Sequence, residues 1–364
     1  MENPMTSTRK MRRSNLELYR IITMYLIVLH HYVVNSGLTA ANGVIYSNSL
    51  SWRSLFLLIA GAWGKTGINC FVLITGYFMC KSHITARKFV KLLGEIFFYN
   101  IIIYLIFLLS GYEPFSIKEL ILTIIPINLI EKNFSECYLV FFLFIPFLNI
   151  LIQQMTKKQY HYLLLISGFA YIVLGTVHRI TFNYVSWFII IYLIGAYLRL
   201  YPLCNDTNTR FWVWLTFTSI ALSALSVCLC TWAHEKLGWG ESYIFVTDSN
   251  SFLPTITAIS SFMLFKNLRI KQSRFINSVA ASTFGVLCIH ANSDTMRRWL
   301  WVDTLDNVGH YSSPWMPVHA LGCAAIVFTI CVLIDKVRIT IFEKPFFKLW
   351  DKKGWTTQTR KNVT

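Results

Sequence analysis

The sequence predicts an all-α, polytopic membrane protein. Of its 364 residues, 55% are hydrophobic and 16% are aromatic, while only 14% are charged. Soluble globular proteins carry about 25% charged residues, so this composition argues against a soluble fold. Apolar runs of about 20 residues, the length that crosses a bilayer as a helix, recur along the whole chain. We therefore expect one membrane-embedded domain.

Ten apolar segments are expected to span the membrane. They are 16–36, 54–79, 89–110, 135–154, 161–177, 184–201, 211–232, 252–267, 277–293 and 316–341. With the N-terminus placed inside, about three quarters of the lysines and arginines fall in inner segments, as the positive-inside rule requires. We therefore expect both termini in the cytoplasm, a basic N-terminal segment 1–15, a transmembrane domain 16–341 and a basic tail 342–364.

The net charge of +16 does not indicate nucleic acid binding, because the basic residues come in short groups between apolar runs. The nine cysteines lie mostly in or beside those runs, as small buried hydrophobes do, and we expect neither disulfides nor a metal site. The stretch Ile117–Ile130 contains Pro126 and is too short to cross comfortably. An interfacial or re-entrant segment is expected there.

The first predicted span carries ionisable side chains. Arg20 and His31 are eleven residues apart, close to three turns at ~3.6 residues per turn, so both point from the same helix face. They lie roughly 16 Å apart along the helix axis. This face is expected to line a protein interior or a wet cavity, because both groups are costly in lipid. In the alternative, Arg20 reaches the interface and the histidines are interfacial.

Basic residues follow the second span. Lys81, Arg87, Lys88 and Lys91 suit a positive-inside anchor, and equally a phosphate-binding surface, since an anion arriving from the cytoplasm would meet them. Just before them, Gly76 is expected to let two helices pack closely rather than to contact a ligand.

Further polar residues lie at membrane depth: Glu95 in the third span, Glu136 at the start of the fourth and His290 near the end of the ninth. Glu95 near the inner rim is expected to pair with a lysine. A lone histidine is commonly a satisfied core residue, but His290 lies at about the same depth as His31, which favours a functional role. The tryptophans of 299–315 are expected to form an interfacial belt.

Four motifs together resemble those of acyltransferase family 3, a family of integral-membrane O-acyltransferases. Arg20 and His31 resemble its Arg-x10-His signature, and Phe71–Phe78 resembles its Phe-x-x-Ser-Gly-Phe element. The basic run 87–91 falls where the family has arginines, and Ser282–His290 resembles its late segment ending in Leu-x-His. The resemblance covers nearly the whole chain and is greatest to the single-domain bacterial branch thought to acetylate cell-surface polysaccharides.

The resemblance implies transfer of an acyl group, acetyl in that branch, from cytoplasmic acyl-CoA to a hydroxyl of an exported or lipid-linked glycan in the bacterial cytoplasmic membrane. It implies that His31 is the general base and that Arg20 contacts the donor. An acyl-histidine intermediate is the alternative to direct transfer. No metal is implied. The candidate phosphate ligands are Lys81, Arg87, Lys88 and Lys91, and the candidate supporting residues are His30, Asn35, Glu136 and His290.

Two other function classes fit parts of the sequence. A transporter or flippase for a lipid-linked saccharide would also carry Arg, His and Glu within membrane helices, but no repeated half with matching interrupted helices is evident. A non-catalytic acyl-CoA or lipid sensor would use Arg20 and the basic run without needing His31. Transfer of label from acyl-CoA to a glycan separates the enzyme from both.

Overall fold

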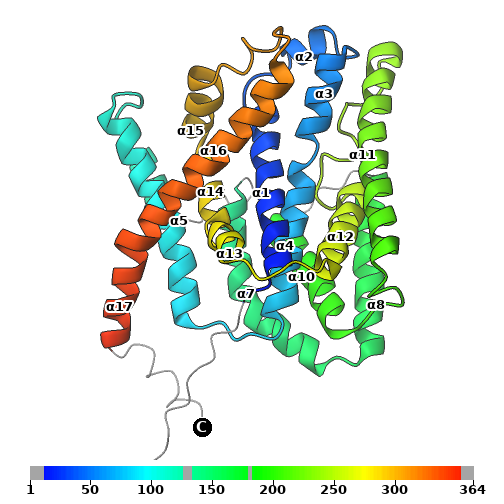
Figure 1. The fold of residues 1–364 in the computed structure, drawn as a ribbon, viewed down its shortest axis with the longest axis vertical. Coiled ribbons are helices and arrows are strands. Elements are labelled where there is room, and N and C mark those ends of the chain that lie inside the picture. Colours follow the sequence, from blue (N-terminus) through cyan, green and yellow to red (C-terminus); the bar gives the residue numbers. More distant parts are fainter. Residues whose placement is uncertain (1–11, 126–132, 179–182, 354–364) are drawn as a thin grey trace, which may run out of the picture.

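The computed structural model describes residues 12–125, 133–178 and 183–353. Over these residues the chain forms helices, turns and loops, with no strand. The long helices stand side by side in one bundle (Figure 1). In chain order they are α1 (Ser14–Val34), α2 (Val44–Ser47), α3 (Trp52–Gly61), α4 (Gly64–Met79), α5 (Ala86–Leu109), α6 (Ile117–Ile124), α7 (Phe134–Gln154), α8 (Lys157–Ser167), the π-helical η1 (Gly168–Val173), α9 (Leu174–Val177), α10 (Tyr184–Leu200), α11 (Thr209–Leu237), α12 (Phe252–Asn267), α13 (Arg274–Ala280), α14 (Thr283–His290), α15 (Asp294–Arg298), the π-helical η2 (Trp299–Thr304), α16 (Met316–Arg338), the π-helical η3 (Ile339–Glu343) and α17 (Lys344–Lys352).

Six helical segments of the described residues are long and apolar enough to cross a membrane. A seventh crossing results if Arg274–His290 and Asp294–Thr304, which are bent by 95° to each other, count as one span. The all-α class is confirmed, and the structure fits a multi-pass membrane protein. The count of ten spans and the cytoplasmic termini stay predictions. The six segments are Trp52–Met79, Ala86–Leu109, Phe134–Gln154, Lys157–Val177, Thr209–Leu237 and Met316–Lys352.

The predicted ninth span, 277–293, is not one continuous helix. It consists of the end of α13, all of α14 and a bend after His290. The break between the two helices is a turn in which the Ser282 amide donates to the Val279 carbonyl at 3.0 Å. Thr283 reinforces the turn, since its hydroxyl donates to the Ala280 carbonyl at 3.0 Å.

The last helix runs further than predicted. α16 continues through η3 into α17 and ends at Lys352, so the expected boundary between 341 and 342 lies inside a continuous helical segment. Pro345 in the first turn of α17 has no amide hydrogen to donate to the preceding turn, and the π-helical η3 lies just before it.

α4 and α10 approach each other through glycines. A Cβ on Gly76 would lie 2.4 Å from the Tyr192 carbonyl oxygen, and one on Gly195 would lie 2.6 Å from the Leu73 carbonyl oxygen. Both distances are far below van der Waals contact, so any larger residue would force the helices apart. This confirms the predicted close-packing role of Gly76.

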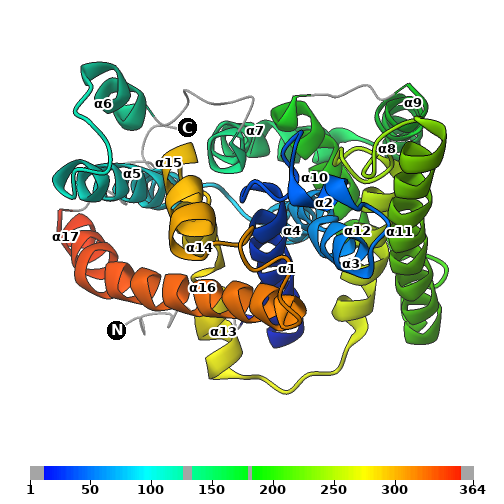
Figure 2. The same ribbon diagram turned by 90° about the horizontal axis from the view of Figure 1, so that it is seen from above.

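α1 occupies the middle of the bundle, where it packs against α3, α4, α12, α13, α14 and α16 (Figure 2). It contributes to two apolar cores: Met24 and Val28 pack with α3, α5, α14 and α16, whereas Leu16 and Tyr19 pack with α4, α7, α10 and α12. α6 lies beside α5 at the edge of the molecule and buries no residue. The rest of the predicted interfacial or re-entrant segment, 126–130, lies outside the described residues.

Candidate functional site

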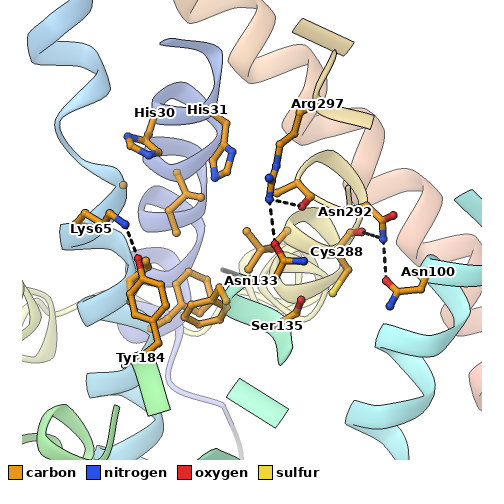
Figure 3. Close-up of a pocket in the computed structure, with 17 residues that line it drawn as sticks. His30, His31, Lys65, Asn100, Asn133, Ser135, Tyr184, Cys288, Asn292 and Arg297 are labelled. Atoms are coloured by element: carbon orange, nitrogen blue, oxygen red, sulfur yellow. Dashed lines mark hydrogen bonds between the residues drawn. The ribbon is translucent and has the colours of Figure 1, made fainter. Parts of the chain in front are cut away.

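Two neighbouring cavities open beside α1, and each contains one member of the predicted Arg20/His31 pair. The histidine cavity has a volume of about 130 Å³ and contains His31 (Figure 3). The basic cavity has a volume of about 290 Å³ and contains Arg20. The face that carries this pair therefore points into cavities, as the spacing predicts.

The polar lining differs between the two cavities. Phe71 and Phe134 line both of them, so the cavities meet at this aromatic pair. The polar residues of the histidine cavity include His30, His31, Lys65, Asn100, Asn133, Ser135, Tyr184, Asn292 and Arg297. The polar residues of the basic cavity include Arg12, Arg20, Thr75, Lys88, Lys91, Glu95, Tyr138 and Thr283.

The His31 ring is held by its surroundings. Its Nδ1 contacts the side-chain amide of Asn35, one helical turn later, which leaves Nε2 as the nitrogen available to a substrate. Its ring meets the rings of His290 and His30 edge to face, with centroid distances of 5.1 and 5.3 Å. Figure 3 shows the ring projecting between Lys65 on one side and Arg297 on the other. The structure thus brings three of the four candidate supporting residues to His31.

His290 is fully buried at the end of α14. Its Nδ1–H donates to the Val286 carbonyl at 2.6 Å, so Nε2 is left as an acceptor, and that atom has no hydrogen-bond partner within the described part of the chain. The ring centroid lies 6.4 Å from that of Trp301, whose Nε1 donor is also without a partner there. His290 is therefore only half satisfied, unlike an ordinary core histidine.

His30 is fixed to the backbone at the junction of α3 and α4. Its Nδ1–H donates to the Gly61 carbonyl oxygen. Gly64 lies against the ring, since a Cβ there would be 2.3 Å from His30 Cδ2. The glycine at position 64 therefore leaves room for the His30 ring. The Nδ1 atom of His30 is not available to a substrate, because it is bonded to the Gly61 carbonyl.

Two cations of the histidine cavity were not singled out as site residues from the sequence. Lys65 donates to the Tyr184 hydroxyl. Arg297 donates from Nη2 to the Ala291 carbonyl at 3.1 Å and to Asn133 Oδ1 at 3.3 Å. The sequence places Arg297 in an outer segment and Lys65 towards the outer end of the predicted span 54–79, and cations in such positions commonly do nothing but face water. The 95° bend after His290 is what directs Arg297 back to the cavity.

A pair of amides, Asn100 and Asn292, lines the wall of the histidine cavity that lies opposite Lys65 and Tyr184. Asn292 Nδ2 donates to Asn100 Oδ1 at 3.0 Å and to the Cys288 carbonyl at 3.1 Å (Figure 3). The contact joins α5 to the end of α14. Its amide groups offer donors and acceptors to a hydroxylated ligand in the cavity.

The basic cavity carries four cations and one carboxylate on its walls. Arg20 and Arg12 share the Glu17 carboxylate, at 3.2 and 3.6 Å. Lys88 Nζ donates to the Ser82 hydroxyl at 2.6 Å and to the His83 carbonyl at 2.7 Å, neither of which is charged. Lys91 Nζ lies 2.5 Å from Glu343 Oε1, so Lys88 is the one cation of this cavity without a carboxylate partner among the described residues. Together the four cations suit a ligand with phosphate groups.

Two predicted phosphate ligands lie elsewhere. Arg87 pairs with Asp351 and lies over the Phe347 ring, 4.8 Å from its centroid. It does so because the last helix continues to Lys352 and brings an acidic residue within reach. Lys81 lines a separate cavity near the end of α7. Of the four predicted cations, only Lys88 and Lys91 line the basic cavity with Arg20.

Glu95 pairs with an arginine rather than with the expected lysine. Its Oε1 lies 3.1 Å from Arg338 Nη2, while Asp335 Oδ1 lies 2.8 Å from Nε and Glu343 Oε2 lies 3.0 Å from Nη1. The Tyr99 hydroxyl donates to the same Asp335 oxygen at 2.8 Å. We call these five residues the Arg338 network. It ties α5 to α16 and η3, and it was missed because Glu95 and Arg338 are far apart in the sequence.

Glu136 does not line the histidine cavity or the basic cavity. It is buried in the first turn of α7, whereas the preceding Ser135 lines the histidine cavity and Phe134 lines both. Among the residues that the structure describes, no three His, Cys, Asp or Glu side chains are grouped so that they would hold a metal ion.

A comparison with known families gives one match. A family model described as an acyltransferase domain matches residues 13–336. The matched region begins just before α1 and ends within α16, so it includes Arg20, His31, His290 and the aromatic pair between the cavities. No curated protein and no solved structure matches the chain significantly.

Proposed function

Because the chain belongs to acyltransferase family 3, we propose that it moves an acetyl group from acetyl-CoA to a hydroxyl of an exported or lipid-linked cell-surface glycan. We place it in the bacterial cytoplasmic membrane, with both termini in the cytoplasm. One observation carries the proposal: a cation-rich cavity and a cavity that contains His31 meet beside the same helix.

The donor occupies the basic cavity. Arg20, Arg12, Lys88 and Lys91 line this cavity, and guanidinium and ammonium groups form strong charge-assisted hydrogen bonds with phosphate oxygens. With the phosphates there, the acyl-pantetheine arm extends towards His31, which lies roughly 16 Å further along the α1 axis. The thioester then reaches the histidine cavity while the nucleotide stays at the cytoplasmic end.

The acceptor occupies the histidine cavity. Its walls offer paired polar groups, Lys65 with Tyr184 and Asn100 with Asn292. Groups of this kind hold sugar hydroxyls through directed hydrogen bonds, and their partners keep them oriented. The acceptor hydroxyl is thereby placed beside His31 Nε2.

His31 acts as the general base. Its Nε2 accepts the proton of the acceptor hydroxyl as the hydroxyl oxygen attacks the thioester carbonyl carbon. The C–S bond breaks, an ester C–O bond forms, and the proton passes from His31 to the departing thiolate. An accepting Nε2 requires hydrogen on Nδ1, which then donates to Asn35 Oδ1. A half-turn of the Asn35 amide presents that oxygen without backbone movement.

The test uses the full-length protein in proteoliposomes with its host's extracted membrane glycans and acetyl-CoA labelled in the acetyl group. We expect label on the glycan, and liposomes without the protein supply the control. Movement of unmodified saccharide across the bilayer without label transfer would instead identify a transporter. Binding of acetyl-CoA with neither transfer nor movement would identify a sensor. Either result would overturn the proposal.

A further inference from the structure

The only route the described cavities offer from the cations to His31 runs past two phenylalanines. Phe71 on α4 and Phe134 at the start of α7 are the residues that the two cavities share. Their ring centroids lie 6.5 Å apart at an interplanar angle of 73°. The edge of one ring therefore faces the other at the point where the cavities meet.

Both rings are held by neighbouring groups. The Phe134 ring stacks on Tyr138, with centroids 5.5 Å apart and planes at 17°, and it also contacts Phe188 at 5.2 Å. The Tyr138 hydroxyl and the Thr75 hydroxyl are 2.8 Å apart, and Thr75 in turn donates to the Phe71 carbonyl at 3.0 Å. One chain of contacts thus links the two phenylalanines, so the width of the opening between them is set by a supported pair rather than by loose side chains.

We propose that the pair formed by Phe71 and Phe134 is the passage for the acyl group and limits its length. The inference rests on the proposed function, because it takes the donor to enter from the basic cavity. A two-carbon acyl group adds little beyond the width of the pantetheine arm itself. A longer acyl chain has to fit beyond the rings, into a cavity of about 130 Å³ that also holds the acceptor hydroxyl.

Removing either ring should therefore relax the selectivity for short acyl groups. One methylene in a well-formed pocket changes specificity by roughly 10- to 200-fold, so the loss of a whole ring is a large change. Shortening Phe71 or Phe134 widens both the opening and the histidine cavity, while the cations that bind the phosphates are untouched.

The experiment is a competition. Membranes containing the protein and their own glycan acceptors receive equimolar acetyl-CoA and hexanoyl-CoA that carry different labels, and the ratio of the two acyl groups on the glycan is measured. For Phe71→Ala and Phe134→Ala we expect the hexanoyl-to-acetyl ratio to rise by about tenfold or more over the wild type. The ratio does not depend on how much protein folds.

The matched control is Phe142→Ala. Phe142 is a buried phenylalanine of the same helix as Phe134, and it lines the basic cavity but not the histidine cavity. We expect its ratio to stay within about twofold of the wild type, because the passage keeps both rings. If the alanine variants do not accumulate, Phe71→Leu and Phe134→Leu keep apolar packing while shortening the ring, and they are expected to shift the ratio in the same direction.

Two outcomes overturn the inference alone: an unchanged ratio in the Ala and Leu variants of both positions, or an equal shift in Phe142→Ala. In both cases acetyl transfer by the wild type would still support the proposed function. Absence of transfer from either thioester by the wild type would overturn the inference and the proposed function together.

Discussion

The histidine cavity and the Arg338 network both place ionisable groups deep among the helices. The two regions differ in the hydrogen bonds and ion pairs that these groups form. In the network, Arg338 faces three carboxylates at 2.8 to 3.1 Å, and its own side chain is 6% exposed. In the histidine cavity, His31 has one nitrogen held by Asn35 and the other free to meet a ligand, and His290 keeps an unpaired Nε2. The Arg338 guanidinium therefore has carboxylates on three sides, although Glu95 Oε1 and Asp335 Oδ2 lack hydrogen-bond partners in the described part of the chain, whereas His31 presents a ring nitrogen to an open cavity.

The difference teaches how to tell structural from functional polar groups inside such a bundle. A buried cation that meets carboxylates from several helices holds those helices together and has no donor left for a substrate. Polar groups that line a cavity with a nitrogen to spare cost stability, and they persist where chemistry needs them. Because Glu95 pairs with Arg338, we assign it to the scaffold although it borders the basic cavity; because His31 presents a nitrogen to a cavity, we assign it to the reaction.

The largest effect is expected from His31→Ala. Removal of a general base should lower kcat for glycan acetylation by roughly 10²- to 10⁴-fold. The thermal unfolding midpoint in detergent should stay close to that of the wild type, because His31 forms no ion pair with the described residues. A variant that retains the wild-type rate would contradict the assignment of His31 as base.

The next effect is on stability and comes from Arg338→Met. This change leaves the carboxylates of Glu95, Asp335 and Glu343 without their shared cation, and we expect a loss of about 3–5 kcal/mol in the free energy of unfolding. The measurement is denaturant unfolding in detergent. Neutralising the partners as well, with E95Q, D335N and R338M combined, should recover much of the loss. Equal stability of Arg338→Met and the wild type would show that the network is not a structural clamp.

Arg20→Ala should weaken donor binding. Hydrogen bonds to charged groups contribute about 1.5–3 kcal/mol, so KM for acetyl-CoA should rise on the order of 10- to 100-fold. The value of kcat at saturating acetyl-CoA should change much less, because Arg20 lies far from His31 along α1. An unchanged KM would assign Arg20 a structural role beside Glu17.

The smallest effect is expected from Arg87→Ala. Its ion pair with Asp351 joins two side chains that are 42% and 49% exposed, and such pairs contribute about 0–1 kcal/mol. KM for acetyl-CoA should therefore change by less than about twofold, in contrast to Lys88→Ala, which removes a cation from the wall of the basic cavity. A rise in KM equal to that of Arg20→Ala would place Arg87 among the donor ligands.

Helix positions and the content of single helix faces were predictable from the sequence. Apolar runs of bilayer length gave the helical segments, and the spacing of Arg20 and His31 gave one face pointing into cavities. The close packing at Gly76 followed from its small size. These properties depend on the residues of one helix and on a fixed helical period.

Contacts between helices were not predictable in the same way. Only the tertiary structure places the ring centroid of His290 5.1 Å from that of His31 and brings Arg297 to the histidine cavity. It also pairs Glu95 with Arg338 and Arg87 with Asp351 of the last helix. The sequence by itself determined which residues share a helix face, because that depends on local geometry. Packing decided which faces meet, because bends such as the 95° turn after His290 and the close approach of α4 to α10 depend on residues far apart in the chain.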